Sequence, residues 1–212
     1  MREKKQKLID YNKNCILNAA GELFHRNGTA KTTMDEIARA ADCSKATIYV
    51  YFKNKDDIYY HIVLEYMTAL RDGLTQCFGR HNDYTSAYRS LCDTLVRFEQ
   101  DNPMYFECML GCISTEPEEQ EKLPVLKTIF DVGEEINTIV CDFLESGKAD
   151  GFIRPDVDSL QAAFVLWSSI CGLISLYANK KTYFEQNLAF TQDDFLANGF
   201  AMILKMITNG GV

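Results

Sequence analysis

Proline and glycine are scarce in this chain of 212 residues, which contains four prolines and twelve glycines. Sheet-rich folds need many turns, and turns draw heavily on these two residues, so their scarcity favours helices. No apolar run approaches the roughly 20 residues that a membrane-spanning helix requires. The polar opening segment Met1–Lys7 does not resemble a secretory signal. We therefore expect a cytoplasmic protein that makes no contact with a membrane.

Catalytic and metal-binding motifs are also missing. The chain has no glycine-rich phosphate loop after a strand, no Gly-x-Ser-x-Gly turn and no His-Glu-x-x-His pair. Its three histidines, His25, His61 and His81, are scattered along the chain. These absences predict a protein that is not an enzyme and that carries neither a cofactor nor a metal ion.

The eight cysteines include no Cys-x-x-Cys pair. Most lie in apolar stretches of helical character, which favours buried, reduced thiols over disulfides. Cys108 and Cys112 are four residues apart and could form a thiol sensor or a soft-metal site. A metal needs further ligands, however, and no histidine lies nearby in the sequence, so ordinary buried cysteines are the favoured interpretation.

Charge is distributed unevenly. The chain as a whole has a formal net charge of −8, yet residues 1–55 carry eleven lysines and arginines against six acidic residues. The remainder carries eleven against twenty-four. A small basic segment attached to an acidic body is typical of a nucleic-acid reader whose body does not touch the nucleic acid.

Apolar residues recur at helical spacing through most of the chain, and no alternating strand pattern is present. The spacing predicts an all-α fold of about nine helices. The first helix ends at Asn27-Gly28, a left-handed stop, and Thr33 with Glu36 has the spacing of a capping box. The predicted helices are Ile16–Gly28, Thr33–Ala41, Ser44–Tyr51, a long helix from Asp56, Tyr84–Gln100, Pro103–Ile113, Pro124–Ser146, Val157–Asn179 and Gln192–Thr208.

The second and third predicted helices are joined by only Asp42 and Cys43. This is the pattern of a helix-turn-helix, in which the second helix enters the major groove of DNA. Small residues, Ala38 and Ala41, allow the two helices to approach closely. Hydroxyl and ammonium groups on the third helix would face phosphates and base edges.

The stretch Thr32–Ile58 closely resembles the DNA-binding signature of the tetracycline-repressor (TetR) family, and Ile16–Gly28 resembles that family's first helix. The resemblance implies an all-α homodimer with a DNA-binding domain over residues 1–55 and a ligand-binding and dimerisation domain over residues 56–212. It implies that the last two helices, about residues 157–179 and 192–208, form the dimer interface. Carried over by position, the predicted DNA-contacting residues are Thr33, Ser44, Lys45, Ala46, Thr47, Tyr49, Tyr51 and Lys55.

The turn departs from the family pattern, which commonly has Gly then Val where this chain has Asp42 then Cys43. Asp tolerates a positive φ better than most residues, so we expect the turn to form. Its negative charge would modestly weaken DNA binding. Oxidation of Cys43 would be expected to disturb the DNA-reading unit. Lys4, Lys5 and Lys7 fit either a DNA-tracking arm or a solvated tail equally well.

The acidic body is rich in aromatic residues and methionine, most of which must be ordinary core. A subset lining a cavity would suit an apolar or aromatic effector. Glu107, Asp131 and Glu134 would favour a cationic one, although solvated helix faces explain them equally well. The candidate effector-binding residues are Tyr66, Met67, Met104, Met109, Phe130 and Trp167.

Two functions from different classes remain open. The first is a repressor that leaves a palindromic double-stranded DNA operator when a small molecule binds its body. The second is a DNA-anchored interaction protein without a small-molecule ligand. A body without an internal cavity would favour the second.

Overall fold

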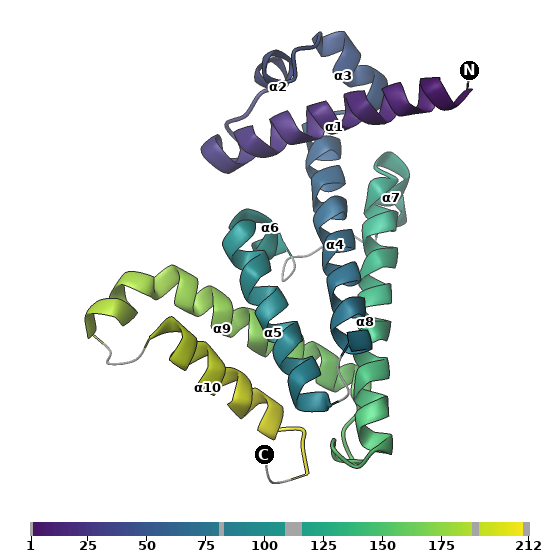
Figure 1. Ribbon diagram of the computed structural model, residues 1–212. Helices are drawn as coiled ribbons and strands as arrows, with labels where there is room; N and C mark the ends of the chain where they lie inside the picture. Colours follow the sequence, from purple (N-terminus) through teal and green to yellow (C-terminus); the bar gives the residue numbers. More distant parts are fainter. Residues whose placement is uncertain (1, 81–82, 109–115, 188–190, 210–212) are drawn as a thin grey trace. The chain divides into compact units, whose positions relative to one another are not determined.

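The computed structural model describes residues 2–80, 83–108, 116–187 and 191–209. These residues form ten α-helices and no β-strand beyond an isolated bridge between Ile153 and Thr208. The all-α prediction is confirmed. The helices are α1 (Arg2–Asn27), α2 (Met34–Ala40), α3 (Lys45–Tyr51), α4 (Lys55–Arg80), α5 (Tyr84–Asp101), α6 (Pro103–Cys108), α7 (Pro117–Lys122), α8 (Val125–Ala149), α9 (Ser159–Asn187) and α10 (Gln192–Lys205) (Figure 1).

One helix was not expected from the sequence. Helix α7 lies in the stretch that the sequence reading treats as a break, and its sequence, Pro-Glu-Glu-Gln-Glu-Lys, has no apolar residue. Hydrophobic periodicity therefore gives no signal there. Its stabilising features are Pro117 at the start, acidic residues in the first turn and Lys122 in the last, which suit the ends of a helix.

The chain divides into two compact units. Unit 1 comprises residues 1–67 and 113–131, and unit 2 comprises residues 68–112 and 132–212. Helices α4 and α8 each contribute residues to both units. Unit 1 is therefore discontinuous in sequence. The predicted boundary between a DNA-binding and an effector-binding domain, at residues 55 and 56, stays a prediction.

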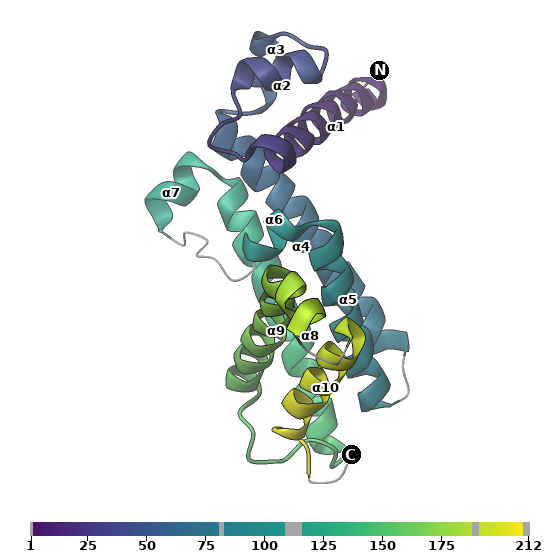
Figure 2. The ribbon, with the colours of Figure 1, turned by 90° about the vertical axis from the view of Figure 1, so that its left-hand side faces the viewer.

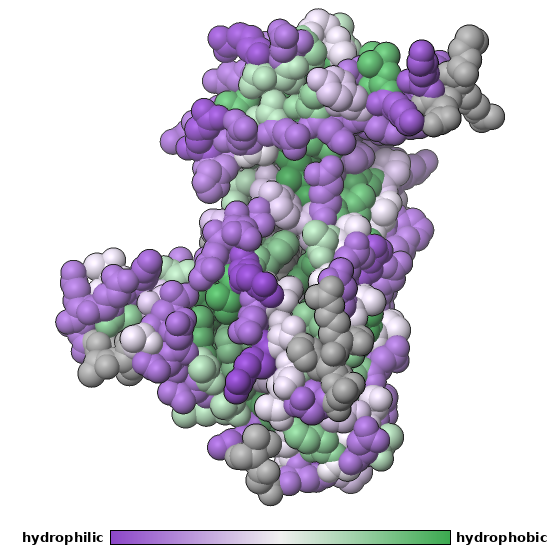
Figure 3. Space-filling model, viewed as in Figure 1, coloured by the Kyte–Doolittle hydropathy of each residue, from purple (hydrophilic) through white to green (hydrophobic). Residues whose placement is uncertain are grey.

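The core of unit 1 consists of large apolar side chains from α1, α2, α3 and the start of α4. Phe24, Ile37 and Ile48 are fully buried, and Phe52 is 1% exposed. Each buried aliphatic or aromatic side chain of this kind contributes about 1.5–3 kcal/mol through removal from water. Hydrophilic side chains dominate the visible surface of α1 (Figure 3). Helices α2 and α3 are thus held on a small apolar core.

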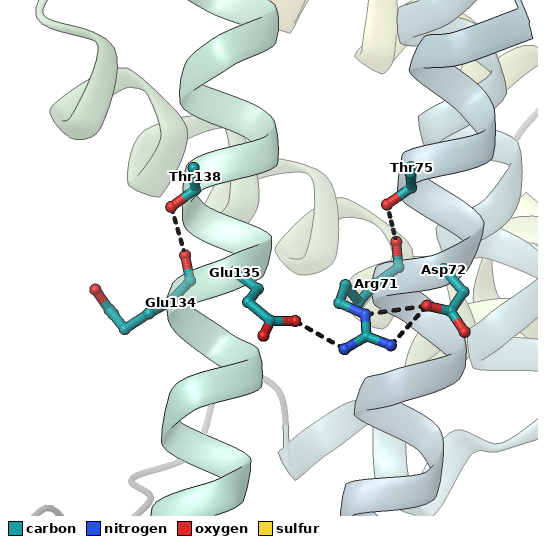
Figure 4. A network of polar contacts seen from close by, with 6 residues as sticks. All are labelled: Arg71, Asp72, Thr75, Glu134, Glu135 and Thr138. Atoms are coloured by element: carbon teal, nitrogen blue, oxygen red, sulfur yellow. Dashed lines mark hydrogen bonds and ion pairs between the residues drawn. The ribbon is translucent and has the colours of Figure 1, made fainter.

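In unit 2, α5 packs on α6, α9 and α10, and α9 packs on α10 (Figures 1 and 2). Its buried core draws on all of these helices and on α8. A polar network links α4 and α8, in which Arg71 bonds to Glu135 at 2.7 Å and to the neighbouring Asp72 at 2.8 Å (Figure 4). The Arg71 side chain is 28% exposed, so this pair is partly shielded from water.

Helix α9 is long and apolar enough, by length and composition alone, to cross a membrane. This finding differs from the expectation from sequence, which is that no apolar run approaches the roughly 20 residues that a membrane-spanning helix requires. Within unit 2 the helix packs against α5 and α10, and 39% of its most apolar window is buried. The buried core helices of soluble proteins can have the same length and apolar composition.

Candidate nucleic-acid interface

Helices α2 and α3 are joined by a sharp turn at the predicted position. Asp42 has φ 50°, in the left-handed region, and the Cys43 N–H donates to the carbonyl of Ala38. The prediction that Asp42 adopts the positive φ normally supplied by glycine is confirmed. Non-glycine residues occupy this region at a cost, which Asp bears better than most.

The two helices of this motif are capped by hydroxyl side chains. Thr33 Oγ1 accepts from the N–H of Glu36 at 3.3 Å, and the Thr33 N–H donates to the Glu36 carboxylate at 2.8 Å, which completes the predicted capping box. The Thr33 hydroxyl also donates to the Glu36 carboxylate at 2.7 Å, and this bond, followed by the one from the Thr33 N–H, lowers the pKa of Glu36. Ser44 Oγ accepts from the N–H of Thr47 at 3.0 Å and caps α3.

Helix α3 buries one side and exposes the other. Ile48 is fully buried, whereas Lys45 and Ala46 are exposed, Tyr49 is 50% exposed and Val50 is 75% exposed. Of the predicted DNA-contacting residues of this helix, Lys45, Ala46 and Tyr49 are thus exposed, whereas Thr47 and Tyr51 are half-buried. Val50 was not predicted, and an apolar side chain this exposed on a reading helix suits contact with a thymine methyl group.

Three of the predicted contact residues already have partners within unit 1. Lys45 Nζ bonds to Asp35 at 3.0 Å, and this bond raises the pKa of the Lys45 ammonium. The Tyr51 hydroxyl accepts from Asn12 Nδ2 at 3.0 Å. Lys55 Nζ donates to the carbonyls of Thr29 and Thr32, the latter at 2.9 Å.

The role of Lys55 is clearest from this geometry. Its ammonium ties the start of α4 to the connector between α1 and α2, a structural role that the sequence reading missed. A lysine carries three donors, and the carbonyl of Ala30, at 3.4 Å, is a third acceptor for this ammonium. Contact of Lys55 with DNA stays a prediction.

Asp57 and Asn54 stabilise the start of α4 and were not singled out by sequence. Asp57 is 6% exposed and accepts the Lys53 N–H at 2.8 Å, and its own N–H donates to Asn54 Oδ1. Lys53 also donates through Nζ to the carbonyl of Lys122 at 2.7 Å, at the end of α7. The sequence offered no signal for this contact because the two residues are far apart along the chain.

The predicted effector-binding residues are less clearly grouped. Tyr66, Met67 and Phe130 belong to unit 1, and Met104 and Trp167 to unit 2, while Met109 lies outside the described residues. Met67 is buried, Phe130 is 40% exposed and the other three are half-buried. Unit 2 contains two cavities, of about 280 and 420 Å³, and none of these residues lines either one. Their role in effector binding stays a prediction.

Comparison with known proteins bears directly on the helix-turn-helix. Residues 16–62 match the family described as bacterial regulatory proteins, tetR family. YhgD of Bacillus subtilis, an uncharacterized HTH-type transcriptional regulator, is 25% identical over 162 residues, which is 76% of this chain and 82% of the relative. Residues 16–62, which include the helix-turn-helix, are thus similar to the DNA-binding region of the TetR family.

Other relatives are similar over more of the chain. The HTH-type transcriptional repressor KstR2 of Mycolicibacterium smegmatis is 26% identical over 148 residues, 68% of each chain. The solved structure of the transcriptional regulator FadR from Bacillus subtilis, in complex with stearoyl-CoA, has the same fold, with a TM-score of 0.69, 18% identity and coverage of 93% and 98%. These relatives are transcriptional regulators and not enzymes. The chain is a transcriptional regulator.

Proposed function

We propose that this regulator is a cytoplasmic, homodimeric repressor that binds a palindromic double-stranded DNA operator and is released by a small molecule. The observation that supports DNA binding is the exposed side of α3, where Lys45, Ala46 and Tyr49 lie outside the core. In a dimer, two such helices would enter successive major grooves about 34–36 Å apart. We propose no catalytic activity.

The proposed dimer interface rests on exposed apolar residues of α9 and α10. Leu160, Phe164, Ser168, Gly172 and Leu176 follow one another at four-residue spacing along α9, and all are exposed. Such spacing places them along one ridge of the helix. A Cβ added at Gly172 would meet nothing within 4 Å in this chain, so a partner helix has room to approach there.

Helix α10 adds two exposed methionines to the same proposal. Met202 is 69% exposed, and Met206, the C-cap residue of the helix, is 49% exposed. Large exposed apolar patches mark interaction surfaces in soluble proteins. Two copies of α9 and α10 would then form a four-helix interface across a two-fold axis.

A small-molecule effector is supported by the cavities of unit 2, because a DNA-anchored interaction protein needs none. FadR, which shares this fold, was solved with stearoyl-CoA, which supports an effector with an apolar body. Effector binding would favour a dimer state whose reading helices no longer match the operator spacing.

The decisive experiment measures binding of the purified chain to an operator selected from randomised duplexes. We expect fluorescence anisotropy to show tight binding that depends on the palindrome and falls steeply with salt, with a log–log slope of about −0.9 for each phosphate contacted. Equal affinity for the selected and scrambled duplexes would contradict the proposal.

A further inference from the structure

A groove of about 280 Å³ lies between α5 and α10, both of which belong to unit 2. Its floor is apolar and buried, since Tyr88, Leu196 and Leu204 are each 4% exposed and Phe200 is 8% exposed. The Tyr88 hydroxyl donates to the Phe200 carbonyl at 3.0 Å, so this polar group is already satisfied. The volume lies near the lower end of the range of about 300–1,000 Å³ for small-molecule sites.

The two helices run in opposite directions along the groove (Figures 1 and 2). The bond from Tyr88 to Phe200 fixes their register. Asp193 precedes Phe200 by seven residues, and Asp93 follows Tyr88 by five, so both lie toward the same end, at a helical rise of about 1.5 Å per residue. Lys205 lies toward the opposite end.

Arg89, one residue beyond Tyr88 in the direction of Asp93, also lines the groove and lies near its middle. The groove is thus acidic at one end, with Asp93 and Asp193, and basic at the other, with Lys205. All four side chains are exposed, and none takes part in the ion pairs formed within the described part of the chain. Their charges are available to a ligand.

We propose that this groove binds an elongated apolar molecule with opposite charges at its two ends, its carboxylate toward Lys205 and its ammonium toward Asp93 and Asp193. The apolar body covers the floor, and each charged end meets its opposite. A singly charged molecule of the same length leaves the rim charge at one end of the groove unmatched. Only the further step, that this molecule is the effector, rests on the proposed function.

The direct test is calorimetric titration of the full chain with 8-aminooctanoic acid, octanoic acid and octylamine. We expect 8-aminooctanoic acid to bind at least tenfold more tightly than either singly charged analogue. Equal affinities for the three compounds, or no binding of 8-aminooctanoic acid, would overturn the proposal.

Variants locate the binding. Ala201→Phe fills the groove from an exposed position of α10, and Asn198→Phe places the same ring at an exposed position of α10 outside it. We expect the first to abolish binding and the second to preserve it, with unchanged circular dichroism in both. Lys205→Glu should lower the affinity for 8-aminooctanoic acid and raise the affinity for octylamine. Undiminished binding by folded Ala201→Phe would overturn the assignment.

Operator anisotropy separates this inference from the proposed function. Release of DNA by 8-aminooctanoic acid supports both. Binding of 8-aminooctanoic acid without release of DNA supports the groove as a binding site and contradicts its role as the effector site. Absence of specific operator binding in the free protein contradicts the proposed function and leaves the calorimetric result standing. If Ala201→Phe instead changes the oligomeric state and no compound binds, the groove is a subunit contact and the proposal fails.

Discussion

Lys45 has an acidic partner before any DNA is present, because Asp35 Oδ2 lies 3.0 Å from its ammonium. Both side chains are largely exposed, at 46% and 67%, so the pair itself contributes little to folding. The pair matters for binding instead, since Asp35 competes with phosphate for the same cation. Asp35 thus opposes the DNA contact that the sequence predicts for Lys45.

We expect Asp35→Asn to tighten operator binding several-fold and Lys45→Ala to weaken it by roughly tenfold. The operator salt slope should fall by about one in magnitude for Lys45→Ala, because one phosphate contact is lost. Lys31→Ala, at an exposed lysine outside the motif, serves as the matched control. An unchanged salt slope in Lys45→Ala would contradict a phosphate contact.

Asp42 combines a positive φ with a negative charge, and two substitutions separate these effects. Asp42→Asn keeps the tolerance for this backbone conformation and removes the charge, so we expect tighter DNA binding at similar stability. Asp42→Ala should lower the free energy of unfolding by about 1 kcal/mol, since Ala bears the left-handed region poorly. Denaturant unfolding and anisotropy measure the two effects. Equal stability of the Ala and Asn variants would contradict the backbone argument.

Cys43 is a poor candidate for oxidation at neutral pH. Burial, followed by the nearby Asp42 carboxylate, raises the pKa of its thiol, and the reactive species is the thiolate. We expect mild peroxide to leave operator affinity unchanged and Cys43→Ser to behave like the parent chain under the same treatment. A loss of affinity that Cys43→Ser prevents would restore the oxidation hypothesis.

At the scale of elements, the capping box of α2 makes a measurable contribution to the free energy of unfolding. We expect Thr33→Ala to lower the free energy of unfolding by about 1 kcal/mol, and Thr33→Ser, which keeps the hydroxyl, to lose much less. Urea unfolding followed by circular dichroism measures both. If the Ser and Ala variants are equally destabilised, the cap is not the cause.

The same cap predicts a pH dependence. The pKa of Glu36 is lowered in the folded chain by its bonds to Thr33, so its contribution is present above its unfolded pKa. That contribution is lost as the pH falls through the lowered folded pKa. We therefore expect the stability difference between the parent chain and Glu36→Gln to shrink as the pH falls through this range. A constant difference would contradict the contribution of the charged carboxylate.

Local signals in the sequence predicted the elements well and the contacts between distant segments poorly. The stop at Gly28, the caps at Thr33 and Ser44 and the turn at Asp42 depend on neighbouring residues, and each was recognisable. Lys53 bonding to the carbonyl of Lys122 depends on the folded chain, as do the groove between α5 and α10 and its charges. Helix α7 escaped because it has no apolar face.

At the scale of the whole molecule, the proposed dimer yields a direct test. Phe164 is 56% exposed in the middle of the α9 ridge, and Phe164→Glu would place a charge in the subunit interface. We expect this variant to be monomeric by light scattering and to lose most of its operator affinity, because two linked reading helices bind far more tightly than one. Thr128→Glu, an exposed change on α8, should remain dimeric.

A dimeric Phe164→Glu protein would place the interface elsewhere. A monomeric variant that keeps full operator affinity would show that pairing of two reading helices is dispensable. Each outcome thus bears on a different part of the proposed function.

The division of unit 1 between residues 1–67 and 113–131 has a consequence for how the chain is synthesised. Helices α1, α2 and α3 contact one another in sequence order and can form early on the ribosome, since local contacts close quickly. The Lys53 ammonium must wait for Lys122 to emerge, some seventy residues later. A recombinant fragment that ends with α4, before Lys122, would therefore lack this contact.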